Sequence, residues 1–316
     1  MSMTGELEQL FAAVGCRGQV CVQRVGGCEI GLDAAAPAVA ASVIKVLIAV
    51  EVQRQLAAGR LDATERVLLP ASARTPGPVG FSLYQDAVEL SLRDLVVAML
   101  TLSDNVAADT LLERVGINAC NTTAKELGLA DTVVVSDLHT MIAGLAHDAG
   151  FADWDTMDRW AEGEQPAADR DAMTTRLLTA RALDPATTTR TTARDMCILL
   201  SAIWTDRATD ANGCAPIRRL MAAQLTRQRL ATGFGPPARV AAKSGGLVGV
   251  VRNEVGVVSY PGGPWYAVAV FTSALHPRVD GRAVDTAIGR AAAIAVEAAS
   301  TAIPTGIPAP APARRP

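Results

Sequence analysis

The segments of this chain that favour β-strands lie at its two ends, and a long stretch of helical patterns separates them. Residues 19–25 and 28–33 flank a Gly-Gly pair and predict a β-hairpin. Three valine-rich segments between residues 239 and 273 alternate or run apolar, which predicts three more strands. Because strands must pair, the sequence predicts an α/β (α+β) fold in which one sheet takes strands from both ends of the chain.

The two lobes predicted in this way are not consecutive along the chain. Residues 1–60 plus 205–302 are expected to form the α/β sheet lobe, and residues 61–204 the helical lobe inserted into it. Residues 303–316 are rich in proline and have little to bury, so they are expected to form a disordered tail.

Charge and cysteine usage exclude several classes of partner. A net charge of −3 leaves no basic surface to attract nucleic acid or an anionic membrane, and we expect neither partner. The N-terminal segment carries Glu6 and Glu8 and no export signal, which predicts a cytoplasmic protein. The six cysteines and three histidines lack metal-ligand spacing, so the cysteines are interpreted as free core thiols and neither a metal nor a cofactor is predicted. The oligomeric state cannot be read from the sequence.

Lysine is rare in this chain: only Lys45, Lys125 and Lys243 accompany the arginines that make up the rest of the 29 basic residues. Unlike arginine, a buried lysine can lose its proton and act as a base. Lys45 follows Ser42 by three residues at the start of an apolar helical pattern, which places the amine and the hydroxyl on one helix face. A desolvated lysine there can activate the serine as a nucleophile; alternatively, Ser42 is only the N-cap of the helix.

Two further motifs carry polar groups at the ends of predicted elements. Ser-Asp-Asn at 103–105 lies between two helical patterns and can project a hydroxyl and an amide into a cleft; alternatively, it caps the second helix. Lys-Ser-Gly-Gly at 243–246 ends an apolar strand. A lysine there needs a partner and the glycines let a ligand approach the backbone; alternatively, the segment is the exit of an edge strand.

Together, these three motifs resemble the SxxK, SDN and KTG set of the class A β-lactamases and penicillin-binding proteins. The resemblance covers about residues 5–300 and departs at Ser244, which stands where KTG has threonine and keeps the hydroxyl. It implies a β-lactamase/transpeptidase-like fold, with an antiparallel sheet flanked by helices and an inserted all-helical lobe.

The resemblance also implies a role for each motif residue. Ser42 would form the acyl-enzyme, and Lys45 would accept or relay its proton. Ser103 would pass a proton to the leaving group, and Lys243 would lower the pKa of Ser103. The backbone N–H groups of Ser42 and Gly246 would form an oxyanion hole. The residues implied in substrate binding are Asn105, Ser244, Gly245, Gly246 and Arg252.

One part of the family pattern is missing. The β-lactamases carry a glutamate, on a loop ahead of a Thr-Thr-Ala helix, that primes the water for acyl release. This chain has no glutamate between Glu164 and Glu254, although Thr-Thr-Ala is present at 191–193. Without that base, hydrolysis of the acyl-enzyme is expected to slow and transfer to an amine to compete with it.

We therefore predict a serine hydrolase or acyltransferase that forms a Ser42 acyl-enzyme on a small-molecule ester, amide or β-lactam, in a role such as natural-product biosynthesis. One alternative is a true class A β-lactamase that uses another base, such as Asp171 or Glu164. The other is a non-catalytic relative that binds a ligand in the same cleft as a sensor or scaffold.

Overall fold

The computed structural model describes residues 2–25, 27–72 and 74–301. The tail predicted at 303–316 lies outside the described residues. No helix in the described ranges is long and apolar enough to cross a membrane.

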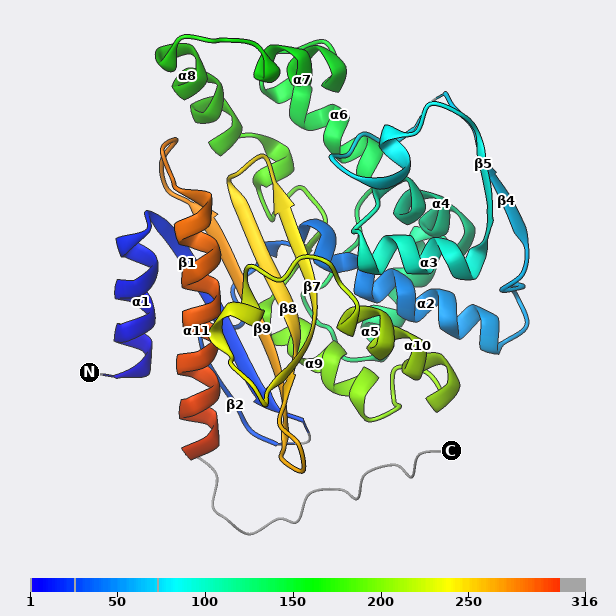
Figure 1. Ribbon diagram of the computed structural model, residues 1–316, viewed down its shortest axis with the longest axis vertical. Helices are drawn as coiled ribbons and strands as arrows, with labels where there is room; N and C mark the ends of the chain where they lie inside the picture. Colours follow the sequence, from blue (N-terminus) through cyan, green and yellow to red (C-terminus); the bar gives the residue numbers. More distant parts are fainter. Residues whose placement is uncertain (1, 26, 73, 302–316) are drawn as a thin grey trace.

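The centre of the fold is one five-stranded antiparallel sheet in the order β2-β1-β9-β8-β7 (Figure 1). β1, from the start of the chain, pairs with β9, from its end, between the register pairs Cys16↔Ala274 and Arg24↔Tyr266. The prediction of one sheet with strands from both ends of the chain is therefore confirmed. The strands of this sheet are β1 (Cys16–Arg24), β2 (Glu29–Leu32), β7 (Arg239–Leu247), β8 (Val251–Ser259) and β9 (Trp265–Ala274).

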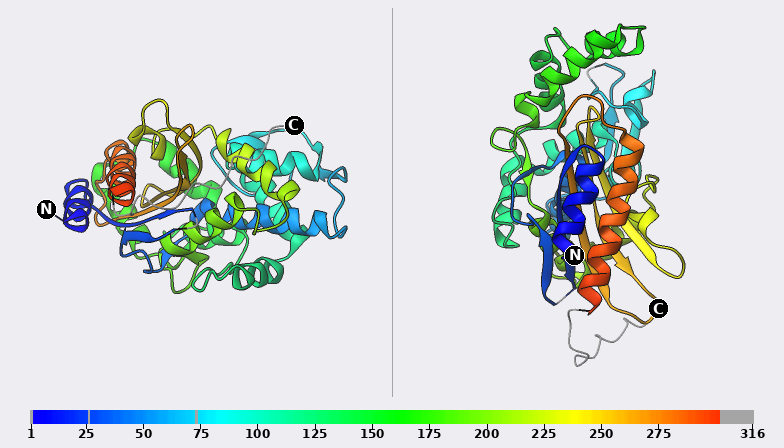
Figure 2. Two further views of the ribbon diagram at one scale, coloured as in Figure 1. Left: turned by 90° about the horizontal axis from the view of Figure 1, so that it is seen from below. Right: turned by 90° about the vertical axis from the view of Figure 1, so that its left-hand side faces the viewer.

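Helices cover both faces of the sheet. α1 (Met3–Ala13) and α11 (Gly281–Thr301) lie side by side on one face (Figures 1 and 2), where Phe11 and Ile288 join one apolar core. α9 (Ala193–Trp204) packs against β1 and β9 on the other face. Because both faces of the sheet are buried, consecutive valines of β8 pack into two different hydrophobic cores. Val257 lies in the larger core, and Val258 lies in the core under α11.

The chain between β2 and β7 is mostly helical, and α2 packs against α3, α4, α5 and α10. α10 also contacts β7, and α9 contacts the sheet, so the lobe boundary between residues 204 and 205 stays a prediction. The elements are β3 (Ala38–Val39), α2 (Lys45–Ala57), β4 (Arg66–Leu69), β5 (Val88–Ser91), α3 (Leu92–Thr101), α4 (Asn105–Val115), α5 (Ile117–Glu126), α6 (Leu138–Asp148), α7 (Trp154–Glu162), α8 (Ala167–Leu178), β6 (Arg190–Thr191) and α10 (Ala211–Ala222).

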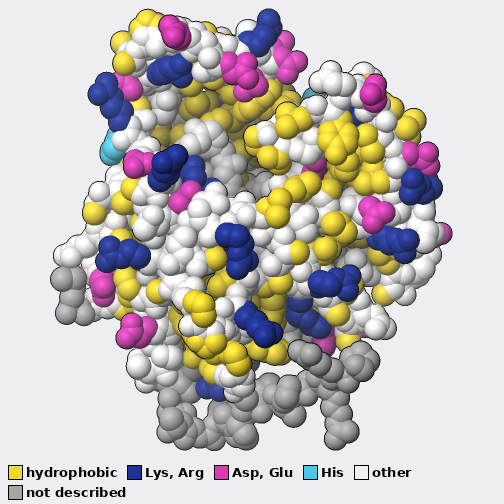
Figure 3. Space-filling model, viewed as in Figure 1, with side chains coloured by type: hydrophobic (Ala, Val, Ile, Leu, Met, Phe, Trp, Pro, Cys, Tyr) yellow, Lys and Arg dark blue, Asp and Glu magenta, His cyan; other side chains and the backbone are white. Residues whose placement is uncertain are grey.

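α7 and α8 extend beyond the end of the sheet (Figure 1). Arg278, in the loop between β9 and α11, forms an ion pair of 2.5 Å with Asp171 of α8. The space-filling view shows a hollow beneath these helices, with apolar side chains on its inner wall (Figure 3). The end of the sheet that carries the last residues of β7 therefore faces a recess rather than a flat surface.

Three local expectations were wrong. The helix predicted to start at Ser42 is preceded by a 3-10 turn, η1 (Ala41–Ile44), because Ala41 has a left-handed φ of +46°. The helical pattern in the sequence at 90–102 predicts a helix that begins at Leu90, but α3 starts at Leu92, because β5 pairs with β4 and Ser91 caps α3 through the N–H of Asp94. All six cysteines are free, but Cys28 is exposed rather than in the core.

Candidate active site

Ser42 lies in the η1 turn, between the left-handed Ala41 and the first residue of α2. The N-cap of α2 is Ile44 and makes no side-chain cap hydrogen bond, so Ser42 is not a helix cap. β7 passes close to this turn at Gly245. A Cβ at position 245 would lie 3.1 Å from the backbone nitrogens of both Ser42 and Val43. The glycine therefore lets the strand approach the N–H groups of the serine turn.

Lys45 is fully buried and joins α2 to the Ser-Asp-Asn loop. Its Nζ donates hydrogen bonds to the backbone oxygens of Ser103 (2.6 Å) and Asp104 (3.2 Å) and to Oδ1 of Asn105 (2.7 Å). Burial lowers the pKa of Lys45 to about 7, against the raising effect of the Asp104 and Asp109 charges. The amine is therefore present in both protonation states near neutral pH.

Ser103 has a left-handed φ of +64°, which costs a non-glycine residue about 1 kcal/mol. Asp104, not Ser103, caps α4, since its carboxylate accepts the N–H of Ala107 at 2.8 Å. The second carboxylate oxygen of Asp104 accepts the N–H of Phe81 at 2.6 Å and ties the 80–83 turn to this loop. The Ser103 hydroxyl is left free of capping and lies 2.8 Å from Nζ of Lys243.

Lys243 is fully buried although β7 is the edge strand of the sheet. Its Nζ also donates to the backbone oxygen of Ser244 at 2.7 Å. Burial holds the pKa of Lys243 well below its usual range, and the positive charge of Lys45 lowers it further. Lys243 binds the hydroxyl of Ser103 and Lys45 binds its backbone oxygen. The two ammonium groups therefore lie close enough to repel each other when both are charged.

The free edge of β7 offers backbone donors to the site. The N–H of Ser244 donates to Oε1 of Gln224 instead of to β8, so it points away from the sheet. N–H groups two residues apart on a strand point to the same side, and the N–H of Gly246 therefore also points off this edge. Asn105 is held at both ends of its amide, by Lys45 and, through Nδ2, by the backbone oxygen of Pro76 at 2.8 Å.

Arg252 lies apart from this group and is bound to an acid. Its Nε and Nη2 donate to the two carboxylate oxygens of Asp285 at 2.8 and 2.6 Å. Asp285 also pairs with the buried Arg229 at 2.7 Å. Arg229 in turn donates to the backbone oxygens of Gly245 and Asn253, each at 2.7 Å. This buried network, which sequence reasoning did not identify, supports β7 directly behind the candidate oxyanion hole.

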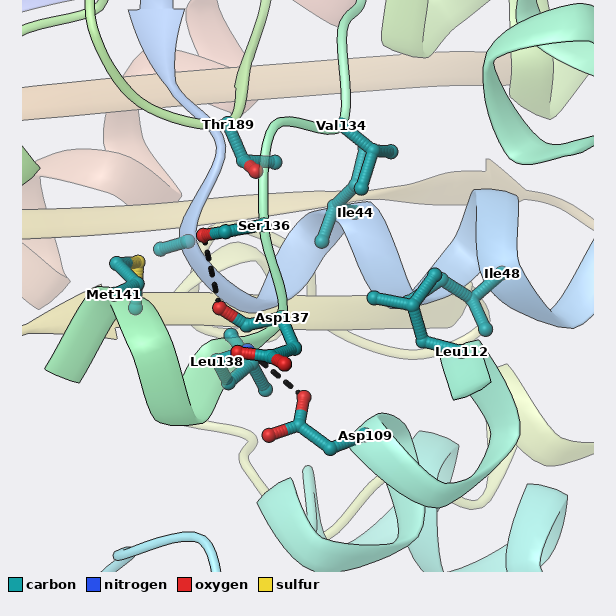
Figure 4. Close-up of a pocket in the computed structure, with 11 residues that line it drawn as sticks. Ile44, Ile48, Asp109, Leu112, Val134, Ser136, Asp137, Leu138, Met141 and Thr189 are labelled. Carbon is teal, nitrogen blue, oxygen red and sulfur yellow. Dashed lines mark hydrogen bonds between the residues drawn. The ribbon is translucent and has the colours of Figure 1, made fainter. Parts of the chain in front are cut away.

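A small cavity of about 10 Å³ lies between the start of α2, α4 and the segment that enters α6 (Figure 4). Ile44 and Asp109 line it, and Figure 4 shows Asp109 and Asp137 on the same side of it. Asp109 accepts the N–H groups of Leu138 and His139, at 2.8 and 2.9 Å. Burial raises the pKa of this carboxyl. A cavity of this size is at the lower limit for holding one water molecule.

The acids proposed from sequence as replacement bases lie on or between the outer helices α7 and α8. Asp171 lies on α8 and its pKa is lowered by the hydrogen bond from Arg278. Glu164 lies between α7 and α8. Within the described residues, neither Lys45 nor Lys243 forms an ion pair with a carboxylate. Asp109, in the middle of the helical pattern at 105–114, could have been noticed in the sequence as an acid on an apolar face.

The profile of the β-lactamase enzyme family matches residues 3–299 of the chain. The chain belongs to this family. The predicted resemblance is thereby confirmed. Among curated proteins, the chain is 28% identical over 289 residues to the "Beta-lactamase regulatory protein BlaB" of Streptomyces cacaoi, covering 87% of this chain and 90% of that protein.

Solved structures of β-lactamases and related proteins share the fold of this family member. The β-lactamase from Sphaerobacter thermophilus superposes with a TM-score of 0.73 at 25% identity, covering 96% of this chain and 98% of that one. PBP-A superposes with a TM-score of 0.72 at 19% identity, over 95% and 96% of the two chains. These likenesses confirm the predicted β-lactamase/transpeptidase-like architecture.

Proposed function

We propose that this protein is a serine hydrolase or acyltransferase that forms an acyl-enzyme at Ser42 with a small-molecule ester, amide or β-lactam. The observation that carries the proposal is the pair of buried lysines, which both bind Ser103, Lys243 at its hydroxyl and Lys45 at its backbone oxygen. Burying two lysines without carboxylate partners costs stability, and such groups are typical of catalytic sites.

In the proposed acylation, Oγ of Ser42 attacks the carbonyl carbon of the substrate and its proton passes to neutral Lys45. The oxyanion accepts hydrogen bonds from the N–H groups of Ser42 and Gly246. The bond to the leaving nitrogen or oxygen then breaks, and the leaving atom takes a proton from the Ser103 hydroxyl, which Lys243 or Lys45 restores. Three donated hydrogen bonds use all three protons of the charged Lys45 amine, so the neutral base forms only when one of those bonds opens and its proton leaves.

The fate of the acyl group decides between hydrolase and transferase. The acids nearest to Lys45 are occupied, since Asp104 caps α4 and Asp109 accepts the N–H groups that open α6. We propose that release to water is slow and that an amine competes as acceptor. A role in natural-product biosynthesis and a cytoplasmic location stay part of this proposal.

Intact-mass spectrometry tests the proposal. The protein is incubated with penicillin G, nitrocefin and a p-nitrophenyl ester, and a stoichiometric adduct is expected that Ser42→Ala abolishes and Ser300→Ala, at an exposed serine on α11, retains. Adding an amine after adduct formation is expected to restore the unmodified mass faster than buffer alone. No adduct with any of the three compounds would contradict the proposal.

Two other functions have specific support. The relative named as a regulatory protein favours a ligand-binding role, which predicts saturable binding of β-lactams without an adduct. The similarity to the Sphaerobacter thermophilus β-lactamase favours hydrolysis, which predicts many turnovers of nitrocefin per protein molecule. A mutant of PBP-A has been solved as its acyl-enzyme complex with penicillin-G, so the same experiment compares this chain with a fold relative.

A further inference from the structure

A second cavity, of about 240 Å³, lies on the sheet beside β3 and is lined by none of the three motifs. Its walls come from β1, β8, β9, β3 and the segment that precedes β6. Phe271 and Val39 are buried and form part of an apolar floor, and Leu183 and Pro185 close one side. This volume is large enough for the apolar body of a small organic molecule.

The mouth of this cavity carries polar groups without partners. Arg17 of β1 and Ser273 of β9 are exposed and stand directly opposite each other in the β1–β9 register. In the part of the chain that the structure describes, neither the Arg17 guanidinium nor the Ser273 hydroxyl forms a hydrogen bond or an ion pair. Gln19 makes only one long contact, of 3.4 Å, to the backbone oxygen of Pro37. A guanidinium, a hydroxyl and an amide therefore converge on one edge of the opening.

The other polar groups of the cavity are already used. Asn253 donates to the backbone oxygen of Val39 at 2.9 Å and accepts the N–H of Thr272 at 3.2 Å. The Thr272 hydroxyl donates to the backbone oxygen of Arg252 at 2.6 Å. No acidic residue is among those that line the cavity. The polar groups still available to a ligand are one guanidinium, one hydroxyl and one amide, which lie next to apolar side chains. This combination complements a carboxylate attached to an apolar body.

We propose that this cavity is a binding site for a small carboxylic acid, whose carboxylate pairs with Arg17 and Ser273 while its apolar part rests on Phe271 and Val39. The site is separate from the serine chemistry and does not depend on the proposed function. It also adjoins the nucleophile's turn, because Val39 precedes Ser42 by three residues and Asn253 holds the backbone of β3.

Binding of benzoate to the Ser42→Ala variant tests this site, because this variant cannot be acylated. Calorimetric titration is expected to show saturable binding, at least tenfold weaker for the uncharged benzamide. Arg17→Gln is expected to weaken benzoate binding at least tenfold. Arg239→Gln is the matched control, since Arg239 is an exposed strand arginine opposite a serine, Ser259, and does not line the cavity. Its benzoate affinity is expected to be unchanged.

Benzoate affinity that is the same in Arg17→Gln and the parent variant would overturn the proposal, because binding then occurs elsewhere, for example beside Lys243. Absence of benzoate binding at millimolar concentration would overturn it equally. If Arg17→Gln lowers the melting temperature, Ser273→Ala replaces it as the test variant, since it removes only a hydroxyl from the mouth. The acyl-enzyme experiment on Ser42 is unaffected by either result.

Discussion

The pKa of Lys45 makes the pH dependence of acylation predictable. With a pKa of about 7, roughly a tenth of the amine is neutral at pH 6 and roughly nine tenths at pH 8. If neutral Lys45 takes the proton of Ser42, the acylation rate constant is expected to rise about tenfold between these pH values, with its midpoint near pH 7. The measurement is a single-turnover time course, with protein in excess over a chromogenic ester or β-lactam and quenching for intact mass.

Asp109 provides a way to move this midpoint. The charge of Asp109 raises the pKa of Lys45, so Asp109→Asn is expected to lower it and shift the rate profile toward lower pH. Asparagine keeps an acceptor oxygen for one of the two N–H groups that open α6, since each binds a different carboxylate oxygen of Asp109. Asp171→Asn is the control, because Asp171 lies on α8 and pairs with Arg278, and its profile should match the wild type. A rate constant that stays flat from pH 6 to 8, or a midpoint that rises in Asp109→Asn, would refute Lys45 as the base.

Three further predictions concern the parts that support the site. The free energy of unfolding in urea is expected to be about 1 kcal/mol higher for Ser103→Gly than for Ser103→Ala, because glycine tolerates the left-handed φ of +64°. Both variants are expected to lose acylation, and equal stabilities would contradict the strain argument. Gly245→Ala is expected to slow acylation about tenfold, since its Cβ would lie 3.1 Å from the backbone nitrogens of the serine turn. Gly235→Ala, whose Cβ would have no atom within 4 Å, is the control, and equal acylation rates in the two variants would argue against the close approach of β7. Asp285→Ala is expected to lower the free energy of unfolding by about 3–5 kcal/mol, because it leaves buried Arg229 without its ion-pair partner. A decrease below about 1 kcal/mol in denaturant unfolding would show that the fold does not need the network.

The sheet could be predicted from the sequence because its signals are local and strong. Valine-rich runs bounded by glycine and proline identified β8 and β9, and the Gly-Gly pair in the sequence separated the two segments that pair as β1 and β2. The start of α2 was misplaced because the left-handed φ of Ala41 depends on the packing of the turn against β7, which no local pattern encodes. Alanine is an unusual residue for that conformation and gave no warning.

Part of the candidate site could also be predicted from the sequence. The scarcity of lysine drew attention to Lys45 and Lys243, and the structure brings both to Ser103. The partner of Arg252 could not be predicted, because Asp285 is distant in sequence and contacts Arg252 only when α11 packs on the sheet. Arg229 was missed for a related reason, since a single arginine in a loop resembles any surface arginine until the backbone of β7 and β8 surrounds it.

The pairing of β1 with β9 has a consequence for how the protein is made. During synthesis, the serine turn leaves the ribosome about two hundred residues before Lys243, and β1 waits still longer for the strand that completes its hydrogen bonding. Contacts of such high sequence separation slow folding, and the exposed edge of β1 is prone to wrong pairing in the meantime. A chain truncated before β9 lacks the strand that pairs with both β1 and β8, so the sheet beside the candidate site is expected to be completed only when translation is almost finished.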